Sequence, residues 1–442
     1  MIVMKFGGSS VANAKRIQHV ASIIKKYADK KPIVVLSAMG DTTDFLLESA
    51  DVALNGKVDI SKIEKLHYDT ADELEISKEA IDSLLTELKA LLTGISMLKE
   101  LTKRTKDYLV SFGERLSVRM VASYLTKKGT PAQFYDAWDI GFLSDSNFMN
   151  AELDDSVWSL IPRGLNDYKC NIKKEIPIVT GFLAKDKNGN ITTLGRGGSD
   201  LSATMIGAAM HVDEVQTWKD VDGILTADPR IVKEAKNVPI ITYDEASELA
   251  YFGSQVLHPR AMYPVKKTKT TVRVKNSYNI DHPGSLIVPE HLEKLTPVRA
   301  ITAVKNIQMI EIVSTRMLGA SGFLAHIFNV FLKWNISIDV IATSEVSVSL
   351  TVAGNLDLTG LLEDLSGIAT CSVQKDKAIV TIICDAAHSS AIMGEGMKSL
   401  ADVGINPDII SQGASKVNIS IVCNMKDVIT CVKTLHKAHF EE

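Results

Sequence analysis

A lysine, two glycines and a serine stand together near the start of the chain, where charge and backbone amides could hold an anion. Lys5 ends an apolar run, Gly7 and Gly8 follow it, and Ser9 precedes an apolar helical pattern. A strand, a glycine turn and a helix start point N–H groups at an anion. This favours a phosphate-handling loop. An ordinary turn with a surface lysine remains the alternative, because glycine-rich turns are common.

A second glycine cluster surrounds a single arginine. Arg196 stands among three glycines, and Ser199 and Asp200 follow at the start of an apolar helix. Either Ser199 or Asp200 can cap that helix. An arginine at such a position can fork onto a carboxylate.

Two further polar stretches could contact a substrate. Glu114 and Arg115 stand beside a glycine within a helical, charge-rich region at 59–128. They could be a solvated helix pair, or they could read the ammonium and carboxylate of an amino acid. The loop at 219–230 holds a lysine, three aspartates and an arginine, and it suits a nucleotide with its metal. A solvated surface loop is the alternative there.

The elements that would position these residues follow from the hydrophobic pattern. Residues 33–36 are a wholly apolar run, typical of a parallel strand buried on both faces. They end on the polar loop 37–43, and the lysine–glycine loop follows the first apolar run in the same way. Ligands in open α/β sheets lie beyond the carboxyl ends of strands. Asn188 and Gly189 predict a hairpin turn further on.

The pattern changes after residues 289–298, which we interpret as a linker. Short strands and amphipathic helices follow, in an order that resembles two copies of a βαββαβ unit of roughly 70 residues. Two copies need eight strands, and the region beyond the linker is one short. Residues 299–304 could supply the missing strand, in which case the two units interleave.

Composition excludes several classes of protein. The net charge of −4 gives no reason to expect nucleic acid or an acidic membrane as a partner. Five cysteines without CxxC spacing favour reduced thiols in a cytosol-like compartment, and each is best interpreted as a small apolar residue. No run of 18 apolar residues and no signal-peptide pattern is present, so we expect a cytoplasmic protein.

Five motifs in this order resemble the aspartate kinase family, and the tail resembles its tandem ACT regulatory domains. The motifs are Lys5–Ser10, Ser37–Gly40, Ser111–Arg115, Gly195–Asp200 and Asp220–Arg230. The resemblance implies an α/β fold, a three-layer αβα sandwich, followed by two α+β ACT domains that interleave. It implies a catalytic domain at 1–290 and ACT domains at 298–370 and 371–442, with one strand exchanged.

The implied activity is ATP-dependent phosphorylation of the β-carboxylate of L-aspartate to 4-phospho-L-aspartate. This is the first step of the pathway towards lysine, threonine and methionine. Mg²⁺ would be carried by ATP without direct protein ligands. A monofunctional, lysine-inhibited homodimer that pairs through its ACT domains is implied as well.

The resemblance also assigns roles to single residues. Catalysis would involve Lys5, Gly8 and Asp200, with Asp200 orienting Lys5. Aspartate would contact Ser37, Thr43, Glu114, Arg196, Gly197 and Ser199, with Glu114 at its ammonium and Arg196 at a carboxylate. The nucleotide would contact Lys5, Gly7, Gly8, Ser9, Lys219, Asp220, Asp222, Leu225, Arg230 and Gln255.

Two departures from many bacterial members stand out. Leu225 replaces a tyrosine, and Gln255 replaces a lysine. This chain carries Lys219 before Asp220 instead, a combination that resembles plant-type aspartate kinases. We hypothesise that Lys219 takes over the phosphate contact of the missing lysine. An exposed lysine without that role is the alternative.

The implied lysine site lies in the first ACT domain. Its residues would be Met317, Ser321, Phe323, Leu324, Ser337, Ile338, Asp339, Ser344 and Glu345, with Asp339 and Glu345 at ammonium groups. Phe323 and Leu324 could instead be core residues of a helix at 321–334, where we expect Phe328 to be buried.

Three other interpretations carry less support. Another amino-acid kinase would share the sandwich but gives no reason for residues 111–115 together with an ACT tail. A non-catalytic amino-acid sensor would not need Lys5, Glu114, Arg196 and Asp200. A bifunctional kinase and homoserine dehydrogenase would need a further dinucleotide-binding domain.

Overall fold

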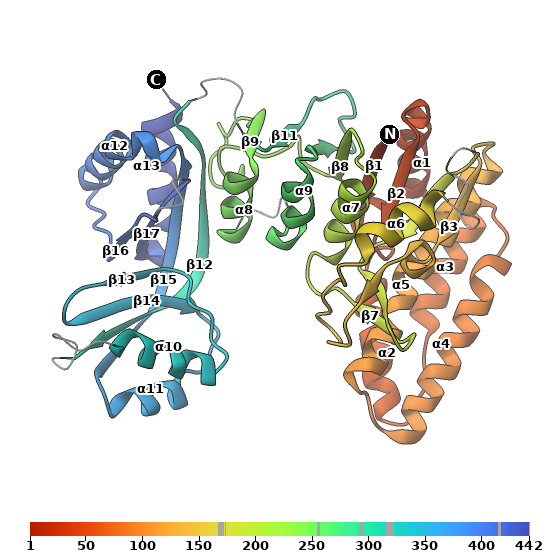
Figure 1. Cartoon of the computed structure of the whole chain (residues 1–442), viewed down its shortest axis with the longest axis horizontal. Helices are drawn as coiled ribbons and strands as arrows, with labels where there is room; N and C mark the ends of the chain where they lie inside the picture. Colours follow the sequence, from red (N-terminus) through yellow and green to blue (C-terminus); the bar gives the residue numbers. More distant parts are fainter. Residues whose placement is uncertain are drawn as a thin grey trace. The chain divides into compact units, whose positions relative to one another are not determined.

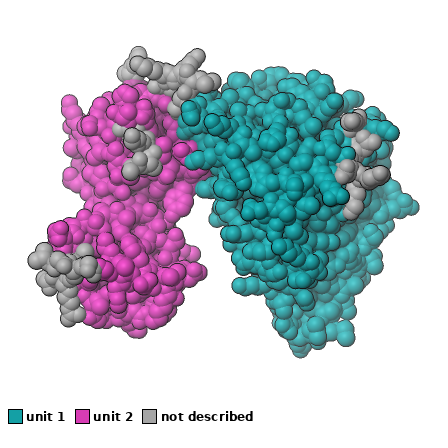
Figure 2. All heavy atoms as spheres, viewed as in Figure 1, with its two compact units in different colours: residues 1–224, 239–243, 256–291 teal, residues 225–238, 244–255, 292–442 magenta. Residues whose placement is uncertain are grey.

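The structure is a computed structural model, and it describes residues 1–166, 172, 174–253, 257–290, 296–314, 322–413 and 417–441 (Figure 1). The chain forms two compact units, coloured in Figure 2. The first contains residues 1–224, 239–243 and 256–291, and the second contains 225–238, 244–255 and 292–442. Two stretches from the middle of the sequence therefore belong to the second unit. The domain boundaries at 290, 298 and 370 stay predictions.

An eight-stranded sheet runs through the first unit. Its strands in spatial order are β3 (Ala132–Tyr135), β5 (Ile176–Thr180), β2 (Pro32–Leu36), β1 (Ile2–Phe6), β8 (Glu214–Lys219), β10 (Val272–Asn276), β11 (Ser285–Val288) and β9 (Ile240–Thr242). The first six are parallel, and β11 pairs antiparallel with β10 and parallel with β9. The carboxyl ends of the parallel strands therefore lie along one edge, as the predicted site requires.

Side-chain alternation in β1 sends Lys5 to a defined face of this sheet. Met4 and Phe6 belong to a core that also holds Ile17 of α1 (Ala14–Lys26) and residues of α5 (Lys103–Lys127). Successive strand residues point to opposite faces, so Lys5 points to the other one. There, α7 (Gly198–Ala209) contacts β1, β2 and β8. Both faces of the sheet are covered, which accounts for the apolar run predicted at 33–36.

The remaining elements of the first unit confirm two predictions. The region expected to be helical contains α3 (Ser61–Leu74), α4 (Glu79–Leu98) and α5. The predicted hairpin joins β6 (Leu183–Asp186) to β7 (Ile191–Thr193), with β4 (Leu143–Ser144) beside β6. The other helices are α2 (Thr42–Leu54), α6 (Val157–Asn166) and α9 (Met262–Thr268). None of the helices in the described ranges combines the length and apolar character that a membrane crossing requires.

The second unit is built on an antiparallel six-stranded sheet. Its strands in spatial order are β13 (Ile341–Thr343), β14 (Ser347–Ala353), β12 (Val298–Val313), β15 (Thr370–Cys384), β17 (Asn418–Asn424) and β16 (Ile409–Ser411). Its helices are α8 (Tyr243–Tyr251), α10 (Phe323–Lys333), α11 (Thr359–Ser366), α12 (Ser389–Asp402) and α13 (Val428–Phe440). This is the α+β pattern predicted for the tail.

One long strand serves both halves of that sheet. Residues 299–304 were expected to form a strand of their own, but they are the first part of β12. That part pairs with the end of β15, which in turn pairs with β17, whereas the later part of β12 pairs with β14. Asn306 and Asp376 have φ angles of 59° and 55°, and the register shifts beside Asn306. Such an irregularity bends a ladder without ending it.

Candidate active site

A cavity of about 380 Å³ lies at the carboxyl ends of β1 and β2, beside the start of α7. It brings together nine of the residues predicted from the sequence. Its lining is Lys5, Gly8, Ser37, Ala38, Gly40, Thr43, Glu114, Phe182 and residues 195–200. Phe182 was missed, although its position just after β5 places it at the same sheet edge. The position of a residue after a buried parallel strand was therefore the useful signal.

Lys5 and Asp200 form a buried ion pair in this cavity. The Lys5 Nζ lies 2.7 Å from a carboxylate oxygen of Asp200, in the first turn of α7. Burial by itself would raise the pKa of Asp200, but the charges of Lys5 and Lys219 outweigh it and hold that pKa below its usual value. Asp200 is therefore an anion that holds the Lys5 ammonium in place.

Lys219 belongs to the same group of charges. It ends β8, the strand next to β1, so its side chain emerges from the same sheet edge as Lys5. Burial lowers the pKa of Lys219, Asp200 opposes this effect, and Lys5 adds to it. Lys5 and Lys219 therefore both lie near Asp200, and Asp220 also acts on Lys219. Two cations are thus gathered at the sheet edge where an anionic ligand could bind.

Glu114 presents an unpaired oxygen. One oxygen of its carboxyl group accepts a hydrogen bond of 3.1 Å from the Ala38 amide. The other, Oε2, is buried and has no hydrogen-bond partner among the described residues. Burial raises the pKa of Glu114 to about 8. A buried acceptor at a cavity wall suits an ammonium group, which would stabilise its charged form.

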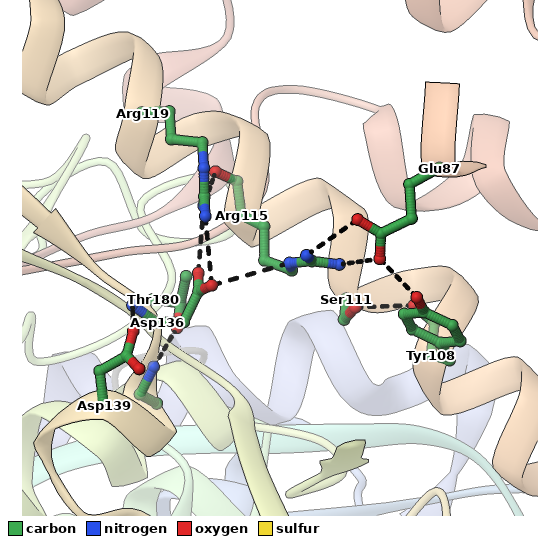
Figure 3. Close-up of polar contacts among 9 residues, drawn as sticks. Glu87, Tyr108, Ser111, Arg115, Arg119, Asp136, Asp139 and Thr180 are labelled. Atoms are coloured by element: carbon green, nitrogen blue, oxygen red, sulfur yellow. Dashed lines mark hydrogen bonds and ion pairs between the residues drawn. The ribbon is translucent and has the colours of Figure 1, made fainter. Parts of the chain in front are cut away.

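Arg115, the residue after Glu114, contacts other side chains and does not face the cavity (Figure 3). Arg115 is buried and forks onto Glu87 through two contacts of 3.3 Å, and Arg119 forks onto Asp136 at 3.1 and 3.2 Å. Consecutive helix residues point about 100° apart, so Arg115 leaves the cavity wall that Glu114 faces. The pair is therefore neither solvated nor jointly directed at a ligand, and Arg115 anchors α5.

The glycine loops approach each other too closely for side chains. A Cβ on Gly8 would lie 2.6 Å from the Ala38 carbonyl oxygen. The Gly40 amide donates to the Gly8 carbonyl at 3.1 Å, and the Ser37 hydroxyl donates to Ser199 at 3.1 Å. The two loops and the start of α7 therefore form one continuous wall. Gly7 and Ser9, also predicted for the nucleotide, lie outside the cavity lining.

The other predicted nucleotide residues are distributed over both units. Asp220 is exposed after β8, and Asp222 accepts hydrogen bonds from Asn276 and Asn279 at 2.8 and 3.0 Å. Both asparagines were missed, although Asn276 ends β10 at the same sheet edge. Leu225 and Arg230 belong to the second unit, where Arg230 pairs with Asp228 at 2.7 Å. Gln255 lies outside the described residues.

The predicted lysine-site residues that the structure describes belong to the second unit. Asp339 accepts a 2.9 Å hydrogen bond from the Tyr251 hydroxyl at the end of α8, and burial raises the pKa of Asp339. Ser344 bonds to Ser347 at 2.8 Å, and Glu345 is exposed. Ser337 is exposed, and Ile338 beside it is half-buried. Met317 and Ser321 lie outside the described residues.

Helix α10 corrects one prediction. Phe328 was expected in the core, but 40% of it is exposed, as is 38% of Leu324. The buried positions are Ile327, Val330 and Phe331, so the helix turns an adjacent face inwards. Ile338 and Phe323 are only partly buried against the same core. The second apolar stripe on the helix hid this orientation from sequence analysis.

The sequence profile of the amino acid kinase family matches residues 1–276, and a profile of the ACT domain matches residues 386–439. The chain therefore belongs to the amino acid kinase family. A chloroplastic aspartokinase 1 of Arabidopsis thaliana is 46% identical over 456 residues, which cover 99% of this chain and 80% of that protein. Within the family, this chain is an aspartate kinase, an enzyme that phosphorylates aspartate.

Two solved structures of Escherichia coli aspartokinase III have the same fold along the full length of both chains. The complex with aspartate and ADP, described as the R-state, is 29% identical with a TM-score of 0.82. The complex with lysine and aspartate, described as the T-state, is 30% identical with a TM-score of 0.79. Both cover 100% of this chain and of the other.

Proposed function

We propose that this enzyme transfers the γ-phosphoryl group of ATP to the β-carboxylate of L-aspartate and releases 4-phospho-L-aspartate, the first step of the aspartate-family pathway. The observation that carries this proposal is the Lys5–Asp200 pair at 2.7 Å in a cavity that also holds the unpaired oxygen of Glu114. Such a cavity offers separate partners for a phosphoryl group and for an ammonium. The E. coli relative solved with aspartate and ADP supports the same pair of ligands.

In this proposal the walls of the cavity hold aspartate by its charges. Glu114 receives the ammonium, and Arg196, exposed at the rim, receives a carboxylate. Ser37 and Thr43 line the space between them. The β-carboxylate is already an anion, so it needs no general base. The enzyme must instead bring it in line with a phosphoryl group that is also negative.

Positive groups at the sheet edge would neutralise that second charge. Lys5 bridges towards the transferring phosphoryl group, the amide of Gly8 donates to it, and Lys219 contacts the phosphate chain. No cluster of three or more metal-ligating side chains occurs in the described ranges, and the cationic donors present suit phosphates that bring their own ion. Mg²⁺ bound to the nucleotide would neutralise its β- and γ-phosphate oxygens.

The direct test is acyl-phosphate formation from aspartate and ATP, trapped as the hydroxamate. We expect product only when both substrates and Mg²⁺ are present. Glutamate should not replace aspartate, because the cavity would have to admit one more methylene. Lys5→Met should abolish the product and lower the melting temperature, because Asp200 loses a buried partner, while the variant stays folded at the assay temperature. Full activity of Lys5→Met would refute the role of Lys5.

Regulation by lysine is part of the proposal. The E. coli relative was solved with lysine, and the second unit of this chain holds Asp339 and Glu345, the two acidic residues predicted for such a site. Asp339 is half-buried beside Tyr251, and Glu345 is exposed nearby in sequence. A lysine ammonium would pair with each. Glu345→Ala should weaken lysine inhibition without loss of catalysis, and equal sensitivity of variant and wild type would refute this assignment.

We also infer a homodimer that pairs through its ACT domains, taken as residues 298–370 and 371–442. The supporting feature is an exposed apolar stripe on α10, with Leu324, Phe328 and Leu332 at successive i, i+4 positions and exposed by 38%, 40% and 75%. A contiguous apolar stripe of this kind is costly in water unless a partner covers it. A cytoplasmic location stays a prediction; the Arabidopsis relative is named as chloroplastic.

A further inference from the structure

The loop that carries Arg196 has little conformational restraint of its own. Gly195 and Gly197, on either side of the arginine, have φ angles of 71° and 75°. Glycines in this left-handed region make a loop pliable. Arg196 itself is exposed at the cavity. To align with the plane of a carboxylate, the Arg196 guanidinium therefore needs residues outside this loop to fix the loop backbone.

Arg260 supplies such a restraint. It follows α8 and residues 254–256 in the sequence, and its side chain joins two loops of the first unit. Nη1 donates to the Asn150 side-chain oxygen at 2.7 Å and to the Leu194 carbonyl at 3.0 Å, and Nη2 donates to the Ala151 carbonyl at 3.3 Å. One planar group thus ties the residue just before Gly195 to a neighbouring loop.

Asp107, on helix α5, restrains the same loop through other hydrogen bonds. It is fully buried on α5 and accepts hydrogen bonds from the Thr193 amide at 3.1 Å and the Thr193 hydroxyl at 2.7 Å. It also accepts from the Met149 amide at 2.9 Å. The Ala151 amide donates to the Thr193 carbonyl at 2.9 Å. The end of β7 before Arg196 and the loop that Arg260 contacts are therefore joined both by the Asp107 side chain and by a backbone hydrogen bond.

The residues around Gly195 and Gly197 leave no room for a side chain at either position. A Cβ on Gly195 would lie 2.5 Å from the Asn150 side-chain oxygen, and a Cβ on Gly197 would lie 2.3 Å from the Cβ of His258. His258 is itself anchored, because its Nδ1 accepts the Arg260 amide at 3.3 Å. The loop is therefore enclosed by Arg260 and His258 on the side of residues 258–260.

Within the described residues, Arg260 donates to the neutral oxygens of Asn150, Leu194 and Ala151, so these bonds leave its charge in place. The charges of Arg260 and Arg196 both reach His258, where they contribute after burial to a lowered pKa. Arg260 thus lies close enough to the cavity rim to add positive potential there. An anionic substrate gains from that potential as well as from the geometry of the loop.

We propose that Arg260 is a positioning residue for aspartate binding: it holds the loop at 193–197 so that the Arg196 guanidinium meets a substrate carboxylate in the correct orientation. Asp107 completes the restraint from α5. The proposal rests on the role proposed above for Arg196. It concerns substrate recognition, because the restrained group contacts aspartate and not the phosphoryl group.

The experiment compares Arg260→Gln, Arg260→Lys, Arg196→Gln and the double variant of Arg260→Gln with Arg196→Gln, by steady-state kinetics. Arg260→Gln should raise the KM for aspartate on the order of tenfold, with kcat and the KM for ATP nearly unchanged, as expected for lost uniform binding. Arg260→Lys keeps the charge without the planar fork, so its KM should lie between those of wild type and Arg260→Gln. In the Arg196→Gln background, Arg260→Gln should raise the KM for aspartate by clearly less than tenfold, because only the contribution of the Arg260 charge remains to be lost.

Arg273→Gln is the matched control. Arg273 belongs to the same unit and donates to Glu214 at 2.7 Å and to the Pro283 carbonyl at 3.1 Å, outside the cavity lining. The KM of Arg273→Gln for aspartate should equal that of the wild type. Fully additive effects of the two arginine substitutions, or an unchanged KM in Arg260→Gln, would overturn the inference. An unchanged KM in Arg196→Gln would instead remove the role of Arg196 on which it rests. Arg260→Lys gives the same comparison if Arg260→Gln does not fold.

Discussion

Two carboxyl groups of one cavity have their pKa values shifted in opposite directions. Burial raises that of Glu114 to about 8, whereas burial of Asp200 is outweighed by the charges of Lys5 and Lys219, which keep its pKa low. When their surroundings shift the pKa values of two carboxyl groups apart, the two groups can take different roles in a reaction. Asp200 is therefore an anion beside Lys5 and Lys219, and in the proposed reaction Glu114 would ionise when the ammonium of aspartate binds.

Glu114→Gln should bind aspartate poorly yet fold more stably at alkaline pH. The pKa of Glu114 is raised from 4.5 to about 8, so between these values the folded state keeps a proton that the unfolded state has lost. The free energy of unfolding of the wild type therefore falls as pH rises through this window. The free energy of unfolding of Glu114→Gln does not fall in this way, and the difference from the wild type amounts to roughly 5 kcal/mol at most.

Thermal melts at pH 4.5 and pH 8.5, without aspartate, measure this effect. We expect similar melting temperatures at the lower pH and a higher one for Glu114→Gln at the upper pH. Its KM for aspartate should rise by about two orders of magnitude, because an amide cannot neutralise an ammonium in a buried site. A variant that is no more stable at pH 8.5 would contradict the shifted pKa.

Lys219→Ala should raise the KM for ATP or lower kcat strongly, because the site would lose one of its two lysines. Lys275→Ala is the matched control: Lys275 is also buried with a pKa lowered by burial, but it donates to the His282 carbonyl at 3.0 Å. Initial rates at varied ATP measure the difference. Wild-type kinetics in Lys219→Ala would sink the hypothesis that it replaces the lysine absent at Gln255.

At the scale of elements, two helices connect the candidate sites to the rest of the fold. Helix α5 presents Glu114 to the cavity. One residue later, Arg115 anchors the helix through its contacts with Glu87 (Figure 3). Helix α8 belongs to the second unit, where Glu245 pairs with Arg299 at 3.3 Å and Tyr251 bonds to Asp339. The chain leaves α8 towards Arg260 of the first unit, so α8 joins the proposed regulatory and catalytic residues in sequence.

Asp136→Asn should destabilise the first unit by about 3 kcal/mol, because it removes a charge that serves two guanidiniums, the buried one of Arg115 and the half-buried one of Arg119. Arg119 forks onto Asp136, and Arg115 lies 3.8 Å from it. Denaturant unfolding measures the loss. Asp72→Asn is the control: its partner Lys78 lies 2.7 Å away, but both side chains are exposed, so it should cost under about 1 kcal/mol. Equal effects would show that the network adds nothing to stability.

Tyr251→Phe should lower the lysine concentration needed for half-inhibition. The tyrosine hydroxyl now satisfies the half-buried Asp339 at 2.9 Å, and its removal leaves a carboxylate that gains more from an ammonium. Inhibition curves at fixed aspartate measure the shift. Tyr243→Phe, which loses a 2.7 Å bond to the Thr270 carbonyl at the other end of α8, should leave the curve unchanged. Weaker or unaltered inhibition in Tyr251→Phe would count against an ammonium at Asp339.

At the scale of the whole molecule, the division into units differs from a simple succession of domains. Residues 225–238 and 244–255 lie between parts of the first unit in sequence but pack within the second (Figure 2). Ala227 and Val232 join the core that contains Ile301 and Val432, and Thr226 bonds to the buried His436 of α13 at 3.0 Å. The segment that follows Asp220 and Asp222 in the sequence therefore belongs to the core of the second unit.

Phe328→Glu should convert the proposed dimer into a monomer, because it places a charge in the middle of the exposed stripe of α10. Light scattering after size exclusion measures the mass. Catalysis should persist and lysine inhibition should weaken if the effector binds between chains. Val403→Glu, at a residue exposed by 48% beyond α12, is the control and should keep the wild-type mass. A dimeric Phe328→Glu would exclude this stripe as the interface.

The sequence by itself determined the class of fold, and it predicted the place of the candidate site. Apolar runs followed by glycines and polar residues marked the carboxyl ends of β1 and β2, because local alternation and turn chemistry are visible along a chain. The order of five motifs then supported the family. Lys5, Glu114, Arg196 and Asp200 were predicted to share a site, and they line one cavity.

Only the tertiary structure decided which neighbours face which partner. Glu114 and Arg115 are equivalent in a sequence pattern, but the rotation of α5 sends one to the cavity and the other to Glu87. Arg260 carried no signal, since its contacts with Asn150 and Leu194 join residues more than 60 positions away. Pairing of polar groups across such distances leaves no periodic trace in the sequence, because it depends on how packed elements meet and not on local propensity.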